Sequence, residues 1–259
     1  MSRSSTALSL TVLKALSILD YLGHARAPVS AMEIGRQLGI PRATVHRLAS
    51  TLAAAGYATV DEDGPEKFSL GLRTLELAGG FLDSLELRRV ASPILEQLRE
   101  LSSETVHLVV RDEGQVVYIA KEDSEHPVRM YSALGRRGFM HSTSVGKAIL
   151  AFLPDSQVAG IIDAHGLRAL TPNTITDRGE LQKELNRVRK LGYAIDDIEN
   201  EESIRCVGAP IFDHTGNPVA AMSLSGPAFR LTRQRIQELV EPLTSAADEI
   251  SRRLGHSTR

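Results

Sequence analysis

The feature that most constrains the fold of this chain is a change of hydrophobic period within its first 70 residues. From residue 8 to residue 56, apolar side chains recur every three or four positions, as on one face of a helix, and glycines punctuate them at Gly23, Gly39 and Gly56. The segments 57–60 and 67–70 then alternate as short strands do, around the turn pair Asp63-Gly64. Short helices followed by a β-hairpin predict a winged helix-turn-helix over residues 1–70.

Start signals and core-facing stripes can be assigned to these helices. Ser30 and Glu33 form a capping box, in which the Ser30 hydroxyl accepts from the amide three residues on and Glu33 reaches back. Pro41 stands at a predicted first helical position, where its missing N–H costs nothing. The predicted core-facing stripes are Val12, Leu13, Leu16, Leu19 and Leu22 in the first helix and Val45, Leu48, Ala49 and Leu52 in the third.

If the stripe of the third helix faces the core, its other side chains lie on an exposed face that can enter a major groove. Arginine can pair with guanine edges or phosphates, and hydroxyl and imidazole groups can contact either. Phosphate contacts are also expected from the wing and from the start of the second helix. The candidate DNA-binding residues are Ser30, Arg42, Thr44, His46, Arg47, Ser50 and Lys67. The alternative is a plain three-helix bundle whose arginines are solvated.

The charge distribution favours double-stranded DNA as a partner, although the 259 residues together carry a net charge of −2. Residues 1–60 hold six basic side chains and two acidic ones, a net charge of +4, so the remaining residues must total −6. This asymmetry is expected when only one domain meets phosphate.

Composition excludes several other classes of protein. A single cysteine, Cys206, excludes an intrachain disulfide and a cysteine-only zinc site. No apolar run approaches the roughly 20 residues that cross a bilayer, and the first ten residues lack the features of a signal peptide. We therefore expect a cytoplasmic protein with no membrane partner. The absence of Trp argues against stacking on single-stranded nucleic acid.

The remainder of the chain predicts a linker and a second domain. A helix over 71–83, weakened by Gly79-Gly80, is expected within a linker at 71–85. Residues 86–259 alternate helical and strand patterns, and two hairpins are expected to turn at 112–114 and 213–217. The predicted helices are 87–103, 144–153, 155–163, 179–190 and 232–254, and the predicted strands are 105–111, 115–121, 128–132, 192–197, 205–212 and 218–224. The fold class is therefore α+β, an antiparallel sheet flanked by helices.

Three segments of the second domain concentrate small and polar residues where a packed core would prefer large apolar ones. Residues 140–147 run into a helix start near Ser144, residues 192–197 end on acids and are followed by Cys206, and Ser223 and Ser225 share one face of a strand. Helix-start amides, hydroxyls and a thiol can together hold a small anion. Each residue also has an ordinary explanation, such as an edge-strand serine or a small buried cysteine.

Two other interpretations of this region remain. An enzyme would use Cys206 as nucleophile and His141 as base, but the sequence supplies no third group to orient them. A metal sensor would bind zinc through His141, Cys206 and a neighbouring acid such as Asp196. We predict no enzyme activity, no cofactor and no bound metal.

Segments along nearly the whole chain resemble the IclR family of transcription regulators. They are VLKALSILDYL, IGRQLGIPRATVHRLASTLAAAGY, FSLGLRTLELA, ETVHLVVRDEGQVVYI, HSTSVGKAILAFLP, LTPNTIT, GYAIDDIENEESIRCVGAPIFDHTG and ISRRLG. The resemblance implies a linker helix that helps pair subunits and a GAF-like effector-binding domain. It also implies homodimers or homotetramers on operator DNA, and control, usually repression, of catabolic operons.

The resemblance further implies how a small organic acid is held. The amides of Ser144 and Val145 would bind it together with polar groups of the second domain. The candidate effector-binding residues are Ser144, Val145, Asp196, Cys206, Ser223 and Ser225, with Met130, Leu134 and Phe139 on the apolar side. Ser142, Ser203 and Gly138 depart from the family pattern, where cysteine, glycine and proline are common. The segments RMYSALGRR and GYAIDDIENEESIRC are most similar to members that respond to sugar-acid breakdown products such as 2-keto-3-deoxygluconate rather than to aromatic acids.

Overall fold

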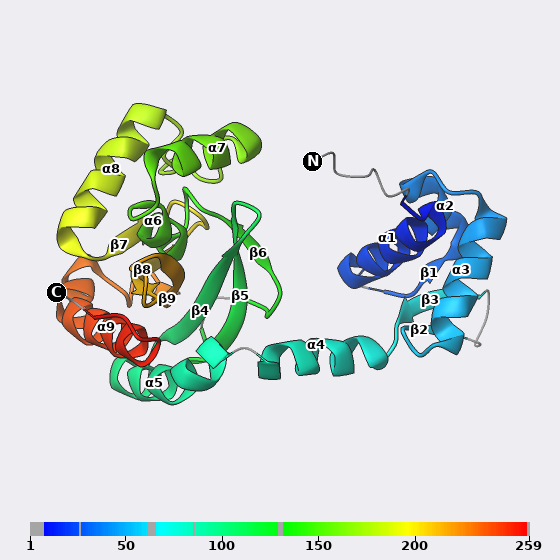
Figure 1. Cartoon of the computed structure of the whole chain (residues 1–259), viewed down its shortest axis with the longest axis horizontal. Helices are drawn as coiled ribbons and strands as arrows, with labels where there is room; N and C mark the ends of the chain where they lie inside the picture. Colours follow the sequence, from blue (N-terminus) through cyan, green and yellow to red (C-terminus); the bar gives the residue numbers. More distant parts are fainter. Residues whose placement is uncertain (1–7, 26, 62–65, 85, 129–131, 258–259) are drawn as a thin grey trace, which may run out of the picture. The chain divides into compact units, whose positions relative to one another are not determined.

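The computed structural model describes residues 8–25, 27–61, 66–84, 86–128 and 132–257. The chain divides into two compact units, Met1–Ser84 and Leu85–Arg259 (Figure 1). None of the described helices is long and apolar enough to cross a membrane.

The first unit is a winged helix-turn-helix, as predicted. Its helices are α1 (Leu10–His24), α2 (Ala31–Leu38), α3 (Arg42–Ala54) and α4 (Arg73–Ser84). An antiparallel sheet of order β1-β3-β2 contains β1 (Val29–Ser30), β2 (Ala58–Asp61) and β3 (Lys67–Leu70). The strand β1 was not expected from the sequence, because two residues carry no periodic pattern. The predicted turn at Asp63-Gly64 lies outside the described residues.

The predicted helix starts were partly right. The Ser30 hydroxyl accepts from the Glu33 amide at 3.3 Å, so Ser30 is the N-cap of α2. Pro41 is not the first helical residue but the N-cap of α3, with ψ at 136°. Its carbonyl accepts from the amides of Thr44 and Val45, and its own backbone conformation stays outside the helical region.

The core of this unit confirms the α3 stripe and corrects the α1 stripe. Val45, Leu48 and Ala49 are buried in a cluster with Phe68 of β3. In α1, however, Val12, Leu13 and Leu16 are about half exposed, at 55%, 45% and 50%. The buried positions of α1 are Ile18 and Leu22, in its second half, because only that half packs into the cluster.

The second unit is an α+β domain built on one antiparallel sheet of order β6-β5-β4-β9-β8-β7. The strands are β4 (Thr105–Asp112), β5 (Gln115–Glu122), β6 (Arg137–Phe139), β7 (Ala194–Asp197), β8 (Ile204–Phe212) and β9 (Pro218–Pro227). Helices α5 (Glu86–Ser102) and α9 (Arg233–Arg253) cover one face, and α6 (Ser144–Leu150), α7 (Asp155–His165) and α8 (Arg178–Leu191) lie on the other side (Figure 1).

One predicted strand of this domain, at 128–132, falls largely outside the described residues. Residues 129–131 lie outside the described part of the chain, and the flanking Val128 and Ser132 belong to no strand. A strand at one edge of the sheet that the sequence did not predict is β6, which pairs with residues 115–117 of β5. Three residues around a glycine are too short to show a strand period.

The register of the sheet places two rows of side chains on the face that packs against α6. One row across the strands is His107, Ser223, Gly208 and Ala194. The neighbouring row is Thr105, Ser225, Cys206 and Asp196. Directly paired residues, and residues two apart on one strand, share a face, so both rows face α6.

Candidate functional site

The charged part of the predicted DNA-binding face is exposed. Arg42 and Arg47 lie on the outer side of α3, Lys67 begins β3, and Thr44 is half-buried in the first turn of α3. Exposed guanidinium and ammonium groups are suited to phosphates and base edges.

Three other predicted DNA-binding residues already have contacts within the chain. His46 Nε2 lies 2.7 Å from Glu66 Oε2, and its ring packs edge-on to Phe68. Ser50 Oγ donates to the carbonyl of His46 at 2.8 Å. Ser30 is occupied as a helix cap. His46 therefore connects the third helix to the hairpin strand, a contact that the sequence did not reveal.

The polar residues predicted for the second domain do come together. Asp196, Cys206, Ser223 and Ser225 are all at most 6% exposed and lie in adjacent positions on β7, β8 and β9. The hydroxyls of Ser223 and Ser225 lie 3.4 Å apart. Burial of so many polar groups on one sheet face is unusual for a packed core, so this face is a candidate site.

His107 of β4 extends this cluster and was missed by the sequence analysis. Its Nδ1 lies 3.2 Å from Ser225 Oγ and its Nε2 lies 2.7 Å from Ser132 Oγ. Burial lowers the pKa of His107 to about 3, so the ring is neutral and offers one donor and one acceptor. The Tyr118 ring packs edge-on against it at 5.1 Å. The sequence signal for His107 is its position as a polar residue in the middle of the apolar run 105–110.

The start of α6 lies directly on the same sheet face. A Cβ at Gly208 would be only 3.0 Å from the carbonyl carbon of Ser144 and the amide nitrogen of Val145. The absence of a side chain at Gly208 therefore lets the helix start approach the row that contains Ser223. The Thr143 hydroxyl caps the helix by accepting from the Gly146 amide at 3.1 Å.

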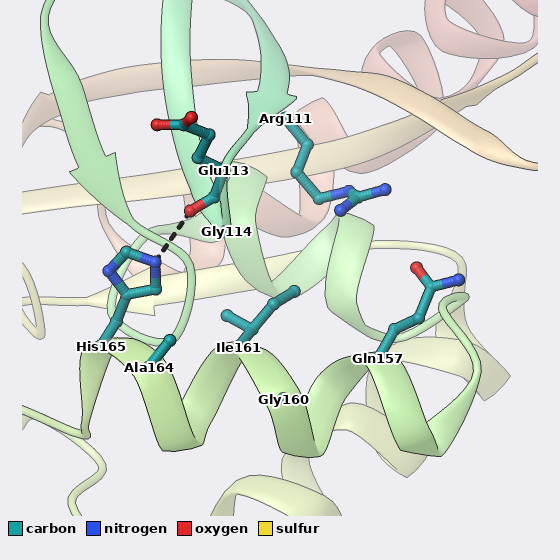
Figure 2. A pocket seen from close by; sticks show the side chains of 8 residues that line it. All are labelled: Arg111, Glu113, Gly114, Gln157, Gly160, Ile161, Ala164 and His165. Carbon is teal, nitrogen blue, oxygen red and sulfur yellow. Dashed lines mark hydrogen bonds between the residues drawn. The ribbon is translucent and has the colours of Figure 1, made fainter. Parts of the chain in front are cut away.

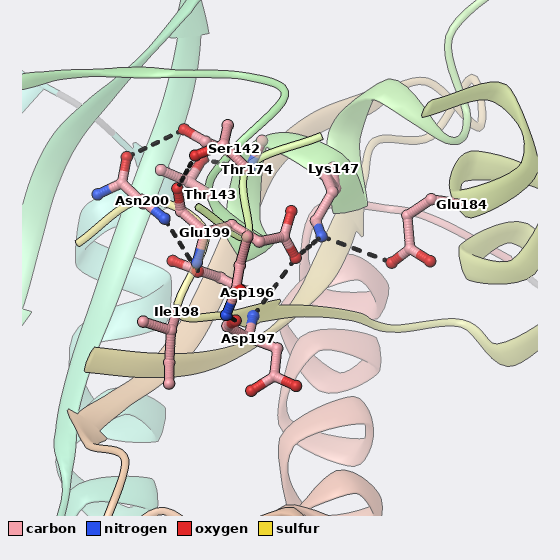
Figure 3. A network of polar contacts seen from close by, with 12 residues as sticks. Ser142, Thr143, Lys147, Thr174, Glu184, Asp196, Asp197, Ile198, Glu199 and Asn200 are labelled. Atoms are coloured by element: carbon pink, nitrogen blue, oxygen red, sulfur yellow. Dashed lines mark hydrogen bonds and ion pairs between the residues drawn. The ribbon is translucent and has the colours of Figure 1, made fainter. Parts of the chain in front are cut away.

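Asp196 is held by a turn that connects it to a buried ion pair (Figure 3). Its Oδ1 accepts from the amides of Glu199 and Asn200 at 2.7 and 3.2 Å. Burial raises the pKa of Asp196 to about 7 despite these hydrogen bonds. Glu199 in turn accepts from Nζ of the fully buried Lys147 at 2.5 Å, and Glu184 lies 3.5 Å from the same Nζ. Lys147 is therefore neutralised within the domain.

The geometry gives no support to a cysteine nucleophile. Burial raises the pKa of the Cys206 thiol well above its usual range, so Cys206 is protonated and unreactive at neutral pH. His141 Nε2 lies 3.1 Å from the carbonyl of Arg168. Among the residues that the structure describes, no group of three or more His, Cys, Asp or Glu side chains is placed to hold a metal ion.

The predicted apolar lining is less concentrated than the polar cluster. Leu134 is 46% exposed on a turn, and Phe139 packs against the ring of His141 at 5.6 Å. Met130 lies outside the described residues. Ser203 has a φ of +65°, a conformation that glycine adopts at lower cost, which explains why a serine is the less expected residue there.

A separate hollow lies between the β4–β5 turn and α7 (Figure 2). It encloses about 280 Å³, and His165 Nε2 bonds to the carbonyl of Glu113 at its edge. Arg111 and Gln157 also line it, and it includes none of the predicted effector-binding residues.

Family models match both units. The model described as the IclR helix-turn-helix domain matches residues 11–62, and the model described as the bacterial transcriptional regulator IclR C-terminal domain matches residues 79–252. Among curated proteins, the HTH-type transcriptional regulator KdgR of Escherichia coli is 37% identical over 95% of this chain and 93% of its own length. The transcriptional repressor IclR of E. coli is 33% identical over 93% of this chain and 88% of its own length.

Solved structures of IclR proteins are also similar to this chain over nearly its whole length. The crystal structure of Thermotoga maritima IclR has a TM-score of 0.79 and 36% identity, and covers 95% of this chain and 99% of its own. An IclR homologue from Microbacterium hydrocarbonoxydans, complexed with 4-hydroxybenzoate, has a TM-score of 0.81 and 25% identity, and covers 94% of this chain and 98% of its own.

Proposed function

Since this chain belongs to the IclR family of bacterial transcriptional regulators, a family of DNA-binding proteins rather than enzymes, we propose that it is a repressor controlled by a small carboxylic acid bound in its C-terminal domain. The controlled genes would form a catabolic operon, and the protein would work in the cytoplasm, where chromosomal DNA lies in bacteria. KdgR and the repressor IclR, its relatives at 37% and 33% identity, support this choice.

The observation that carries the effector proposal is the buried polar cluster of Asp196, Cys206, Ser223 and Ser225 beneath the start of α6. Hydroxyls and helix-start amides donate to a carboxylate, and a protonated Asp196 could do the same. We propose that Ser144 and Val145 supply those amides, and that Met130, Leu134 and Phe139 contact the apolar part of the ligand.

A keto sugar acid such as 2-keto-3-deoxygluconate is our first choice of effector. The resemblance of segments 129–137 and 192–206 to members that respond to sugar acids favours it, and so does the abundance of hydroxyl groups at the site. An aromatic acid would be the expected alternative, because a relative binds 4-hydroxybenzoate.

At the DNA we propose that Arg42, Thr44 and Arg47 enter the major groove and that Lys67 contacts phosphate from the wing. Ser30, His46 and Ser50 remain candidates for the same interface. His46 would contact DNA only if its contact with Glu66 broke or if Glu66 moved together with it.

We propose that the functional unit is a homodimer or homotetramer. Several large apolar side chains of the first unit are exposed, and a second copy would remove them from water. They are Leu8, Leu10, Val12, Leu13 and Leu16 at and before α1, and Leu72, Leu75, Leu77 and Phe81 at and within α4.

We propose that effector binding changes operator binding by way of α4. The amide of Gly71 donates to the carbonyl of Tyr57, and the amide of Arg73 to that of Gly56, so the start of α4 is tied to the loop that ends α3. A Cβ at Gly71 would lie 2.2 Å from the Gly56 oxygen, which leaves no room for another residue. An effector that favours one placement of α4 would thereby change operator affinity.

The experiment that tests this function is a thermal-shift screen of the full chain against small organic acids, followed by operator-binding assays with each acid that raises the melting temperature. A sugar acid that stabilises the protein and changes operator affinity supports the proposal. Stabilisation by stoichiometric zinc, with no response to any acid, would contradict it and favour a metal sensor.

A further inference from the structure

The hydroxyl of Ser144 is buried at the candidate effector site without a hydrogen-bond partner. Ser144 is 1% exposed, and its Oγ contacts no donor or acceptor in the part of the chain that the structure describes. Capping does not explain it, because Thr143 supplies the N-cap hydroxyl of α6.

Three serines in later turns of helices bond in a way that is not open to Ser144, because Ser144 is the first residue of α6 and no helical carbonyl lies four residues before it. Ser50, Ser92 and Ser251 each donate at 2.8 Å to the carbonyl four residues earlier, the ordinary way in which a helix satisfies such a hydroxyl. Buried hydroxyls in native proteins nearly always have a partner, so the exception at Ser144 calls for an explanation.

The position of Ser144 supplies that explanation. Its Oγ would lie 3.1 Å from a Cβ at Gly208, so it sits directly over the sheet face of the site. Gly208 is paired with Ser223, and Cys206 is two residues away on the same face. The unpartnered hydroxyl therefore lies among the groups proposed to bind the effector.

The charged groups near the site are neutral or paired, so individual hydrogen bonds are expected to determine which acids bind. His107 is neutral, and Lys147 is paired with Glu199 and Glu184. Lys121, which lies opposite His107 on β5, is paired with Asp123. When neutral donors rather than a free cation bind an acid, selectivity depends on how many polar groups find partners.

We propose that the Ser144 hydroxyl is a specificity-determining group that hydrogen-bonds to a keto or hydroxyl oxygen on the carbon next to the effector's carboxylate. This inference rests on the proposed effector site. The amides of Ser144 and Val145 would hold the carboxylate, and the hydroxyl on the same residue lies close enough to meet an oxygen one carbon further on. An acid that lacks this oxygen leaves the hydroxyl unpaired.

The test compares acids that differ in that oxygen, using the full chain. Pyruvate, lactate and 2-keto-3-deoxygluconate carry it, and propionate and butyrate do not. Dissociation constants are measured by calorimetry for the wild type and Ser144→Ala, and melting temperatures are measured without ligand. In the wild type, the oxygen-bearing acids bind more tightly than the others.

Ser144→Ala is expected to weaken binding of the oxygen-bearing acids about tenfold and to leave the affinity for propionate and butyrate within about twofold. Its melting temperature without ligand should be unchanged or higher, since the substitution removes a buried hydroxyl that has no partner.

Ser251→Ala is the matched control, because it also removes a buried helical hydroxyl, but one that accepts from the Phe212 amide at 3.0 Å and donates to the Ala247 carbonyl. This variant should melt at a lower temperature and keep the wild-type preference among acids. A melting temperature that falls in Ser251→Ala but not in Ser144→Ala separates a structural hydroxyl from a ligand-directed one.

Two results would overturn the inference. If the acids bind the wild type but Ser144→Ala keeps the same preference, or melts well below the wild type, the hydroxyl is structural and only this inference fails. If none of the acids binds the wild type, the effector site itself is wrong, and the inference fails with it.

Discussion

The two groups of side chains proposed to bind ligands have opposite surroundings. Arg42, Arg47 and Lys67 of the first unit are exposed. Ser223, Ser225 and Asp196 of the second unit are buried and joined to neighbouring groups by hydrogen bonds. Exposed charges act at a distance and are screened by salt, whereas buried hydroxyls act only at contact. Substitutions in the two regions should therefore have separable effects.

The largest expected effect is in the buried region. Ser223→Ala combined with Ser225→Ala removes two hydroxyls proposed to donate to a carboxylate, and hydrogen bonds to charged groups contribute about 1.5–3 kcal/mol each. Effector affinity, measured by calorimetry, should fall about 100-fold or more. Operator affinity without effector should stay at the wild-type value. A loss of operator binding instead would show that these serines are structural.

The second largest expected effect is on operator affinity, from a substitution in the exposed region. Arg42→Ala should weaken operator binding about 10- to 100-fold if Arg42 contacts a guanine edge, because such a contact contributes about 1–3 kcal/mol. The melting temperature and effector affinity should not change, since the side chain is exposed. Fluorescence anisotropy on operator and scrambled DNA checks this, and an equal loss on both duplexes would mean that Arg42 contacts only phosphate.

The third effect concerns pH and belongs to Asp196. An anionic effector disfavours ionised Asp196, so binding above the pKa of about 7 must take up a proton. Effector affinity should therefore fall as pH rises above about 7, approaching tenfold per pH unit. His107, with a pKa of about 3, and Cys206, with a strongly raised pKa, stay neutral in this range.

Asp196→Asn is the matching control for that titration. The amide cannot ionise, so the affinity measured by calorimetry between pH 6.5 and 8.5 should become flat. The same slope in the variant and the wild type would assign the proton to another group.

The smallest effect is expected at the contact between α3 and the wing. Glu66→Gln removes a negative charge from the side proposed to face DNA and weakens the pair with His46. Exposed pairs of this kind contribute little to stability, about 0–1 kcal/mol, so the melting temperature should barely move. Operator affinity at low salt should rise about two- to fivefold because repulsion of phosphate is reduced. A fall in affinity would show that the His46–Glu66 pair positions the wing.

Local signals explain what the sequence predicted. The capping serine at Ser30, the glycine after α2 and the change of period after Gly56 each act within a few residues, and together they were enough for the winged helix-turn-helix. The α1 stripe was right at Leu22 but wrong at Val12, Leu13 and Leu16. Several apolar faces are possible on a helix rich in leucine, and packing against α3 and β3 selects Ile18 and Leu22.

Long-range pairing explains what the sequence did not predict. His107 meets Ser225 across 118 positions, and Lys147 meets Glu199 across 52. Neither contact has a local pattern, since each depends on sheet order and on how closely α6 approaches Gly208. The serines, Cys206 and Asp196 could be proposed because they interrupt apolar runs and match a family pattern, whereas the missing partner of the Ser144 hydroxyl is visible only in three dimensions.

If one chain couples an exposed DNA-binding face to a buried effector site, each ligand must change the affinity for the other by the same factor. The dissociation constant of the effector is measured by calorimetry with and without saturating operator DNA, and that of the operator with and without saturating effector. We expect the two ratios to be equal and to differ from one by about 5- to 150-fold. An effector that binds with the same affinity in the presence and absence of operator would contradict this coupling.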